Sequence, residues 1–156
     1  MPVFDIPGFG RLDLEHLVLD CNGTIAIDGV LIPGVANRMA ALAESFTIHV
    51  ATADTHGTAR AMLAGLPCAV TLLGPGPEDV SKQRIIHELG AARTAFVGNG
   101  RNDRLALADA ALGIAVIQSE CAAAGAVAAS DIVAPDILMA LELFRHPKRL
   151  IATLRT

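Results

Sequence analysis

The stretch Val18-Leu-Asp-Cys-Asn-Gly-Thr24 places an acidic residue, Asp20, at the end of a short apolar run and follows it with a glycine turn. A short apolar run bounded by turn residues is typical of a buried β-strand. In an open α/β sheet, ligands bind beyond the carboxyl ends of the strands, so we expect chemistry at Asp20. A carboxylate in that position can attack phosphorus and form an aspartyl phosphate.

Outward from this stretch, short β-branched apolar runs alternate with Ala- and Leu-rich segments of helical period. This alternation is typical of repeated βα units, which build a parallel sheet. The predicted strands are residues 16–20, 47–51, 68–72, 95–97 and 112–115, with a sixth at 131–133. The predicted helices are residues 35–44, 55–63, 80–89, 103–108, 121–128 and 135–144, with a final amphipathic helix in 146–156. The sequence therefore predicts an α/β fold, a Rossmann-like three-layer sandwich whose parallel sheet of five or six strands has helices on both faces.

A two-stranded flap is predicted directly after the first strand. Residues Ile25–Ile32 alternate apolar and small side chains around Asp28-Gly29, a pair that suits the positive φ angles of a tight hairpin turn. Neither the segment after this β-hairpin flap nor the segment between Thr52 and Lys82 is long enough for a cap domain. We therefore expect a single domain over residues 1–156, with the flap at about 25–32 and no cap.

Charge and hydropathy exclude two classes of partner. Twelve basic and sixteen acidic residues give a formal charge of −4, and no basic run forms the stripe that binds nucleic acid. Apolar stretches such as Ala111–Ile117 fall far short of the roughly 18 residues of a membrane span. The first ten residues lack the basic start and apolar middle of a signal peptide. We expect no nucleic acid partner, no membrane insertion and no export.

The cysteines indicate a reducing compartment. Cys21, Cys68 and Cys121 are odd in number and form no C-x-x-C pair, which argues against a disulfide framework and against a zinc site. The sequence therefore predicts a cytoplasmic protein.

Four short motifs, in chain order, resemble those of the haloacid dehalogenase superfamily. Asp20-Cys-Asn-Gly-Thr24 resembles motif I, which follows the first strand and precedes a flap. Thr52 resembles the motif II hydroxyl residue, and Lys82 resembles the motif III lysine. Gly98-Asn-Gly-Arg-Asn-Asp103 resembles the acidic loop of motif IV.

This resemblance implies a hydrolase of the phosphatase type, with Mg²⁺ as its cofactor. The residues implied as catalytic are Asp20, Asn22, Thr52 and Lys82. Those implied as phosphate-binding are Asp20, Asn22, Gly23, Thr52, Ala53 and Lys82. The implied metal ligands are Asp20, the backbone carbonyl of Asn22, and the side chains of Asn99 and Asp103. These assignments agree with the preference of Mg²⁺ for hard oxygen ligands and retained waters.

The closest likeness within the superfamily is to the phosphorylation domain of P-type ATPases and their soluble relatives, through Val97–Asp103 and the strand that follows. Two carboxylates expected in most family phosphatases are amides here, Asn22 and Asn99. Asn22 cannot shuttle a proton, a contribution typically worth about 10²–10⁴ in rate. Two readings stay open: a slow phosphatase or phosphotransferase with an aspartyl-phosphate intermediate, or a pseudo-phosphatase that binds phosphate or a phosphorylated partner without turnover.

The absence of a cap leaves the predicted site open. By resemblance, the substrate is a phosphorylated small molecule or macromolecule, and a neighbouring subunit can supply the lid. We expect a homo-oligomer with flaps near the interface, because four flap side chains are apolar: Ile25, Ile27, Val30 and Ile32.

Overall fold

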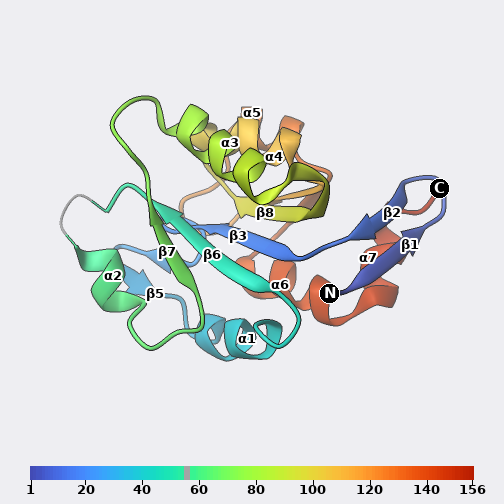
Figure 1. Cartoon of the computed structure of the whole chain (residues 1–156), viewed down its shortest axis with the longest axis horizontal. Coiled ribbons are helices and arrows are strands. Elements are labelled where there is room, and N and C mark those ends of the chain that lie inside the picture. Colours follow the sequence, from blue (N-terminus) through green and yellow to red (C-terminus); the bar gives the residue numbers. More distant parts are fainter. Residues whose placement is uncertain (55–56) are drawn as a thin grey trace.

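A six-stranded parallel sheet forms the centre of the protein, with strands in the order β10-β9-β8-β3-β6-β7 (Figure 1). The computed structural model describes residues 1–54 and 57–156. The strands are β3 His16–Asp20, β6 Thr47–Thr52, β7 Ala69–Leu72, β8 Thr94–Gly98, β9 Leu112–Val116 and β10 Ile132–Ala134, and each neighbouring pair is parallel. All six predicted strands are confirmed, with ends that differ by at most one residue.

Helices cover both faces of the sheet, as predicted (Figure 1). They are α1 Val35–Leu42, α2 Thr58–Met62, α3 Glu78–Leu89, α4 Arg104–Asp109, α5 Ala124–Ala129, α6 Ile137–Arg145 and α7 Pro147–Leu154, with 3-10 turns η1 Ala91–Arg93 and η2 Arg101–Asp103. Helices α3, α4 and α5 lie on one face, and α1 and α6 lie on the other. The first two residues of the helix predicted at 55–63 lie outside the described residues.

Alternate side chains of the central strands feed two separate apolar clusters. Val18 and Phe96 pack with residues of α3 and α4, whereas Leu17, Leu19 and Val97 pack with residues of α1 and α6. Side chains of a strand point to opposite faces in turn, so a strand covered on both sides must be apolar throughout. This explains why the strands appear in the sequence as continuous apolar runs.

The flap is a short hairpin of β4 Ala26–Ile27 and β5 Val30–Leu31. Its turn residues Asp28 and Gly29 have φ angles of 50° and 76°, as predicted for this pair. Ile25, just before the hairpin, is fully buried in the protein's own core, whereas Val30 is 68% exposed. The flap is therefore fastened at its base and exposed at its tip.

A second hairpin, which the sequence analysis did not predict, precedes the sheet. Strands β1 Val3–Ile6 and β2 Gly10–Asp13 pair antiparallel, and the hairpin contacts α7. Phe4, Ile6 and Leu12 from this hairpin are buried in the core. It lies at the amino edge of the sheet, beside both chain ends (Figure 1).

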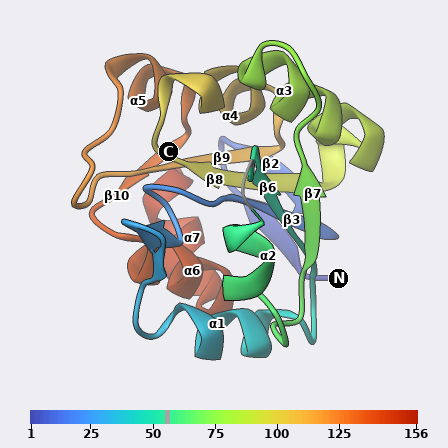
Figure 2. The ribbon, with the colours of Figure 1, turned by 90° about the vertical axis from the view of Figure 1, so that its left-hand side faces the viewer.

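The opposite edge, where the parallel strands end, faces the viewer in Figure 2. The flap and α2 lie together at this edge, and the loops after β3, β6, β8 and β9 meet there. Across residues 1–54 and 57–156, no helix has both the length and the apolar character that crossing a membrane requires.

Candidate active site

Asp20 occupies the centre of the carboxyl edge. It ends β3, which lies between β6 and β8, and its side chain is almost buried. Lys82, in the second turn of α3, donates a hydrogen bond from Nζ to Asp20 Oδ1 at 2.6 Å. Lys82 is only 2% exposed, so its ammonium group depends on protein carboxylates for stabilisation.

Asp103 holds the same ammonium group from the other side. Lys82 Nζ also donates to Asp103 Oδ1 at 2.6 Å. The second oxygen of Asp103 accepts hydrogen bonds from the backbone N–H groups of Asn99 at 2.9 Å and Gly100 at 2.8 Å. Asp103 is fully buried and both its oxygens are engaged, so it positions Lys82 and the loop after β8. The metal contact expected of Asp103 stays a prediction.

Gly98 makes room for this arrangement. A Cβ atom added to Gly98 would lie 2.5 Å from Asp103 Oδ2 and 2.6 Å from Asp103 Cγ. Side chains do not approach this closely, so even alanine at the end of β8 would displace the carboxylate that holds Lys82.

Asn99 presents a fixed oxygen to the site. Its amide nitrogen donates to the backbone carbonyl of Cys121 at 3.0 Å, which turns its Oδ1 towards motif I. Thr24 Oγ1 lies 3.3 Å from this oxygen and donates to Asp20 Oδ2 at 3.1 Å. The amide oxygen and the Asp20 carboxylate are therefore neighbours on either side of one hydroxyl group.

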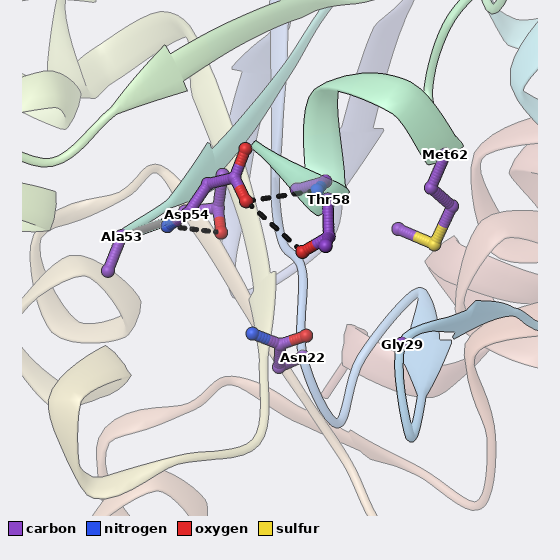
Figure 3. A pocket seen from close by; sticks show the side chains of 8 residues that line it. Asn22, Gly29, Ala53, Asp54, Thr58 and Met62 are labelled. Carbon is purple, nitrogen blue, oxygen red and sulfur yellow. Dashed lines mark hydrogen bonds between the residues drawn. The ribbon is translucent and has the colours of Figure 1, made fainter. Parts of the chain in front are cut away.

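Two adjoining chambers meet at Asn22, Thr52 and Ala53. The carboxylate chamber, of about 290 Å³, is lined by Asp20, Asn22, Thr52, Ala53, Leu73, Glu78, Lys82, Asn99, Gly100, Asn102 and Glu120. The flap chamber, of about 190 Å³, is lined by Asn22, Gly29, Thr52, Ala53, Asp54, Thr58, Ala59 and Met62. In Figure 3 the Asn22 side chain lies below those of Asp54 and Thr58, with the flap at Gly29 to its right.

Thr52 presents its hydroxyl group to both chambers. The Thr52 side chain is buried at the end of β6, and its Oγ1 accepts a hydrogen bond from the backbone N–H of Asp54 at 3.3 Å. Since the oxygen accepts, the hydroxyl hydrogen can still be donated. Asp54 in turn accepts from the backbone N–H of Ala59 at 3.0 Å, at the start of α2, and this bond lowers the pKa of Asp54.

The buried charges give the carboxylate chamber a negative character. Burial and the neighbouring Asp103 carboxylate raise the pKa of Asp20 to about 6, against the opposing effect of Lys82. Burial lowers the pKa of Lys82, but Asp20 and Asp103 outweigh it and hold this pKa above its ordinary value. At neutral pH two carboxylates therefore surround one ammonium group, and the excess negative charge attracts a cation.

The oxygen donors fit Mg²⁺ better than a softer metal. No cluster of three or more His, Cys, Asp or Glu side chains suited to a metal occurs among residues 1–54 and 57–156. Mg²⁺ keeps several waters and needs only one or two carboxylates with other oxygens, which Asp20, the Asn22 carbonyl and Asn99 Oδ1 can provide. The fixed orientation of Asn99 supports this fit, because its oxygen and not its nitrogen lies beside the Thr24 hydroxyl, which also contacts Asp20.

Seven of the eight predicted site residues either line a chamber or hold a residue that does. The exception is Gly23, which lines neither chamber and whose backbone N–H donates to the Ala26 carbonyl at 2.8 Å. The phosphate contact predicted for Gly23 stays a prediction. Cys21, next to Asp20, is buried, and burial raises the pKa of its thiol to about 11.

Sequence reasoning missed the residues that follow β9. Gln118 donates from its amide to the carbonyls of Gly23 at 2.8 Å and Thr24 at 2.6 Å, and so fastens the motif I loop. Glu120 lines the carboxylate chamber. Both follow the carboxyl end of a predicted parallel strand, and that position was the available signal.

A search of known sequences finds a close relative of unassigned activity. No protein-family model matches the chain. The uncharacterized protein MJ0073 of Methanocaldococcus jannaschii is 42% identical over 84 residues, which covers 51% of this chain and 90% of that protein. The chain and MJ0073 therefore belong to one family.

Solved structures reveal what the fold is. A putative HAD family hydrolase from Streptomyces avermitilis superposes with a TM-score of 0.67 and 22% identity, over 85% of this chain and 84% of its own. The chain has the haloacid dehalogenase fold. The 3-deoxy-D-manno-octulosonate 8-phosphate phosphatase of Moraxella catarrhalis, crystallised with magnesium, phosphate and KDO, superposes with a TM-score of 0.71 and 14% identity, over 92% and 94% of the two chains.

A pump domain has the same haloacid dehalogenase fold. A zinc-transporting PIB-type ATPase in its E2.Pi state superposes with a TM-score of 0.57 and 25% identity, over 79% of this chain. The match spans 21% of the pump chain, so it concerns one part of that protein. The resemblance to the haloacid dehalogenase superfamily, and to P-type ATPases within it, is therefore found in the structure as well as in the sequence. As predicted, the described residues contain no cap domain.

Proposed function

We propose that this protein is a Mg²⁺-dependent phosphatase or phosphotransferase that forms an aspartyl phosphate on Asp20. The observation that carries this proposal is the placement of Asp20, Lys82 and Thr52 in one chamber at the carboxyl edge of a haloacid dehalogenase fold. A nucleophile, a cation and a hydroxyl donor around one small polar space suit phosphoryl transfer, which depends mostly on positioning and charge neutralisation.

In the first step, Asp20 attacks phosphorus while the bond from phosphorus to the leaving-group oxygen breaks. Lys82 and the Thr52 hydroxyl stabilise the phosphoryl oxygens, and Asp103 keeps Lys82 in place. Bound Mg²⁺ would supply further positive charge to these oxygens, with Asp20, the Asn22 carbonyl and Asn99 as its protein ligands. In the second step, water attacks the aspartyl phosphate, which releases phosphate and restores the Asp20 carboxylate.

Asn22 limits the rate of both steps. It lies between the two chambers, where a carboxylic acid would protonate the leaving group and then activate water. An amide is neither an acid nor a base near neutral pH, so the leaving group must take its proton from solvent. We propose slow turnover with a long-lived aspartyl phosphate, since general acid/base catalysis is typically worth about 10²–10⁴ in rate.

The flap chamber is the proposed site for the leaving group. It adjoins the carboxylate chamber through Asn22, Thr52 and Ala53, and its volume of about 190 Å³ favours a small polar group. The phosphate esters of sugar acids are a reasonable test class, given the phosphatases that share the fold. A phosphorylated macromolecule would instead present a single side chain to this space.

The deciding experiment measures phosphate release from p-nitrophenyl phosphate and a panel of sugar and sugar-acid phosphates, with and without Mg²⁺. We expect Mg²⁺-dependent turnover that Asp20→Asn abolishes and that Asn22→Asp raises by about 10²-fold. If neither the wild-type protein nor Asn22→Asp releases phosphate from any ester, the proposed activity is wrong.

A pseudo-phosphatase is the second candidate, favoured by the amides at Asn22 and Asn99. Such a protein would bind phosphate through Lys82 and Thr52 without turnover. Calorimetry with inorganic phosphate separates the two candidates when combined with the assay: binding without turnover in either variant supports the second.

Assembly and location complete the proposal. We propose a homo-oligomer in which the exposed flap tip at Val30 lies near a neighbouring subunit, and a cytoplasmic protein, in keeping with its three free cysteines. Light scattering tests the homo-oligomer, and a monomeric mass would show that this proposal is wrong. Ile25 does not contribute to the proposed interface, because it is buried in the core of its own chain.

A further inference from the structure

We propose that Glu120 binds the Mg²⁺ ion, directly or through a coordinated water, and replaces the carboxylate that Asn99 lacks. This inference rests on the proposed function, because it concerns the metal of the same site. It assigns a role to a residue outside the four motifs, in the loop after β9.

The first observation is the place of the Glu120 side chain. It lines the carboxylate chamber together with Asp20, Asn22 and Asn99, and it does not line the flap chamber. A Cβ atom added to Gly23 would overlap Glu120 Oε2 and would lie 2.7 Å and 2.9 Å from the two amide atoms of Asn99. The Glu120 carboxylate and the Asn99 amide therefore lie against the same point of the motif I loop.

Gly23 makes this approach possible. Its φ angle of 81° is favourable only for glycine, and the missing side chain leaves the space that Glu120 Oε2 occupies. The carboxylate thus reaches the loop that carries the Asn22 carbonyl, which is one of the expected metal ligands. Asn99 Oδ1, the other fixed oxygen, is on the same side of the chamber.

The second observation is charge. Within residues 1–54 and 57–156, Glu120 makes no ion pair or side-chain hydrogen bond, although the carboxylates of Asp20 and Glu78 line the same chamber beside Lys82. Solvent screens the repulsion at the exposed Glu120 side chain in the metal-free protein, and a bound cation would attract all of these carboxylates. Glu120 adds a further negative charge to this chamber, which a bound divalent cation would offset.

The alternative for Glu120 is to act as the general acid that Asn22 cannot be. A general acid must reach the leaving group, and the leaving-group space is the flap chamber on the other side of Asn22. Glu120 lines only the carboxylate chamber, where the expected metal ligands lie, so its position favours metal binding over proton transfer.

Glu78 provides a matched control. It lines the same chamber and carries the same charge, but its carboxylate accepts a hydrogen bond from Asn102 and lies in the first turn of α3. If only the electrostatic field of the chamber mattered, losing either glutamate would weaken metal binding equally.

The experiment is calorimetric titration of the full chain with MgCl₂, repeated with Mn²⁺ observed by electron paramagnetic resonance. We expect Glu120→Gln to weaken Mg²⁺ binding by about tenfold or more, and Glu78→Gln to change it by less than about threefold. Asn99→Asp in the Glu120→Gln background should restore the affinity. Thermal melting without metal should be unchanged in Glu120→Gln, because the side chain is exposed.

Equal losses in the two variants, an unchanged affinity in Glu120→Gln, or no Mg²⁺ binding by the wild type at millimolar concentration would each overturn the inference. Its failure is distinguishable from failure of the proposed function. Turnover by the wild type together with unchanged metal affinity in Glu120→Gln removes only the role of Glu120. Weakened metal binding without any turnover keeps that role and removes the phosphatase.

Discussion

The carboxylate chamber and the flap chamber share three residues but are constructed in opposite ways. The first is organised by buried ion pairs among Asp20, Lys82 and Asp103, with N–O distances of 2.6 Å. The second is formed by an exposed hairpin turn and a short helix, with hydrogen bonds around Asp54. The carboxylate chamber would act on the phosphoryl group that all phosphate esters share, which requires a rigid arrangement. The flap chamber would contact the rest of the ester, so its lining can change in sequence without disturbing the reaction.

The largest effect is expected from Lys82→Met, which removes the buried cation of the carboxylate chamber. The buried carboxylates of Asp20 and Asp103 would then lack a cation between them, and breaking a buried ion pair typically costs about 3–5 kcal/mol. We expect a large fall in melting temperature and complete loss of phosphate release. The paired Lys82→Met, Asp103→Asn variant should recover stability without activity, and a failure to do so would contradict the ion-pair account.

Gly98→Ala tests the carboxylate chamber without changing a charge. Its Cβ would displace the Asp103 carboxylate, so we expect a loss of about 1–3 kcal/mol in the free energy of unfolding and a lower rate of phosphate release. Denaturant titration measures the first effect. Gly125→Ala is the control, because a Cβ there meets no atom within 4 Å.

Met62→Ala addresses the flap chamber. We expect a several-fold change in KM that differs from one phosphate ester to another, with inorganic phosphate binding unchanged, because Met62 lines only the second chamber. Steady-state kinetics over the ester panel gives the result. A uniform fall in kcat for every ester would mean that the two chambers are not separable.

The smallest effect is expected from acid, at the far edge of the sheet. Burial, with a smaller contribution from His16, lowers the pKa of His49, whose ring nitrogen lies 3.2 Å from that of His16. A histidine with a lowered folded-state pKa contributes stability that is present above about pH 6.5 and falls as the pH drops through the lowered value. Between pH 7.5 and 5.5 we expect His49→Thr to lose less melting temperature than the wild type, by about 2 °C or less. If both proteins lost the same melting temperature, groups other than His49 would cause the acid sensitivity.

The sheet could be predicted from the sequence to within one residue at each strand end, because the central residues of strands such as His16–Asp20 are covered on both faces and are therefore apolar. The N-terminal hairpin escaped prediction, because its two strands are only four residues each and alternate exposed and buried side chains around Pro7. Short motifs predicted Asp20, Thr52 and Lys82, since their positions follow from strand ends. Gln118 and Glu120 follow a predicted strand, which marks their loop as a candidate, but which of its side chains reach the site depends on how the loop folds back.

Gln118 also joins two parts of the chain that are distant in sequence. The same side chain that donates to Gly23 and Thr24 accepts a hydrogen bond from the backbone N–H of Ile137, at the start of α6, at 3.0 Å. The catalytic loop is thus tethered to a helix on the outer layer of the molecule. A displacement of α6 would move Gln118 and, through its hydrogen bonds, the loop that carries Asn22. A ligand or partner that shifts α6 would therefore change the rate of the proposed reaction.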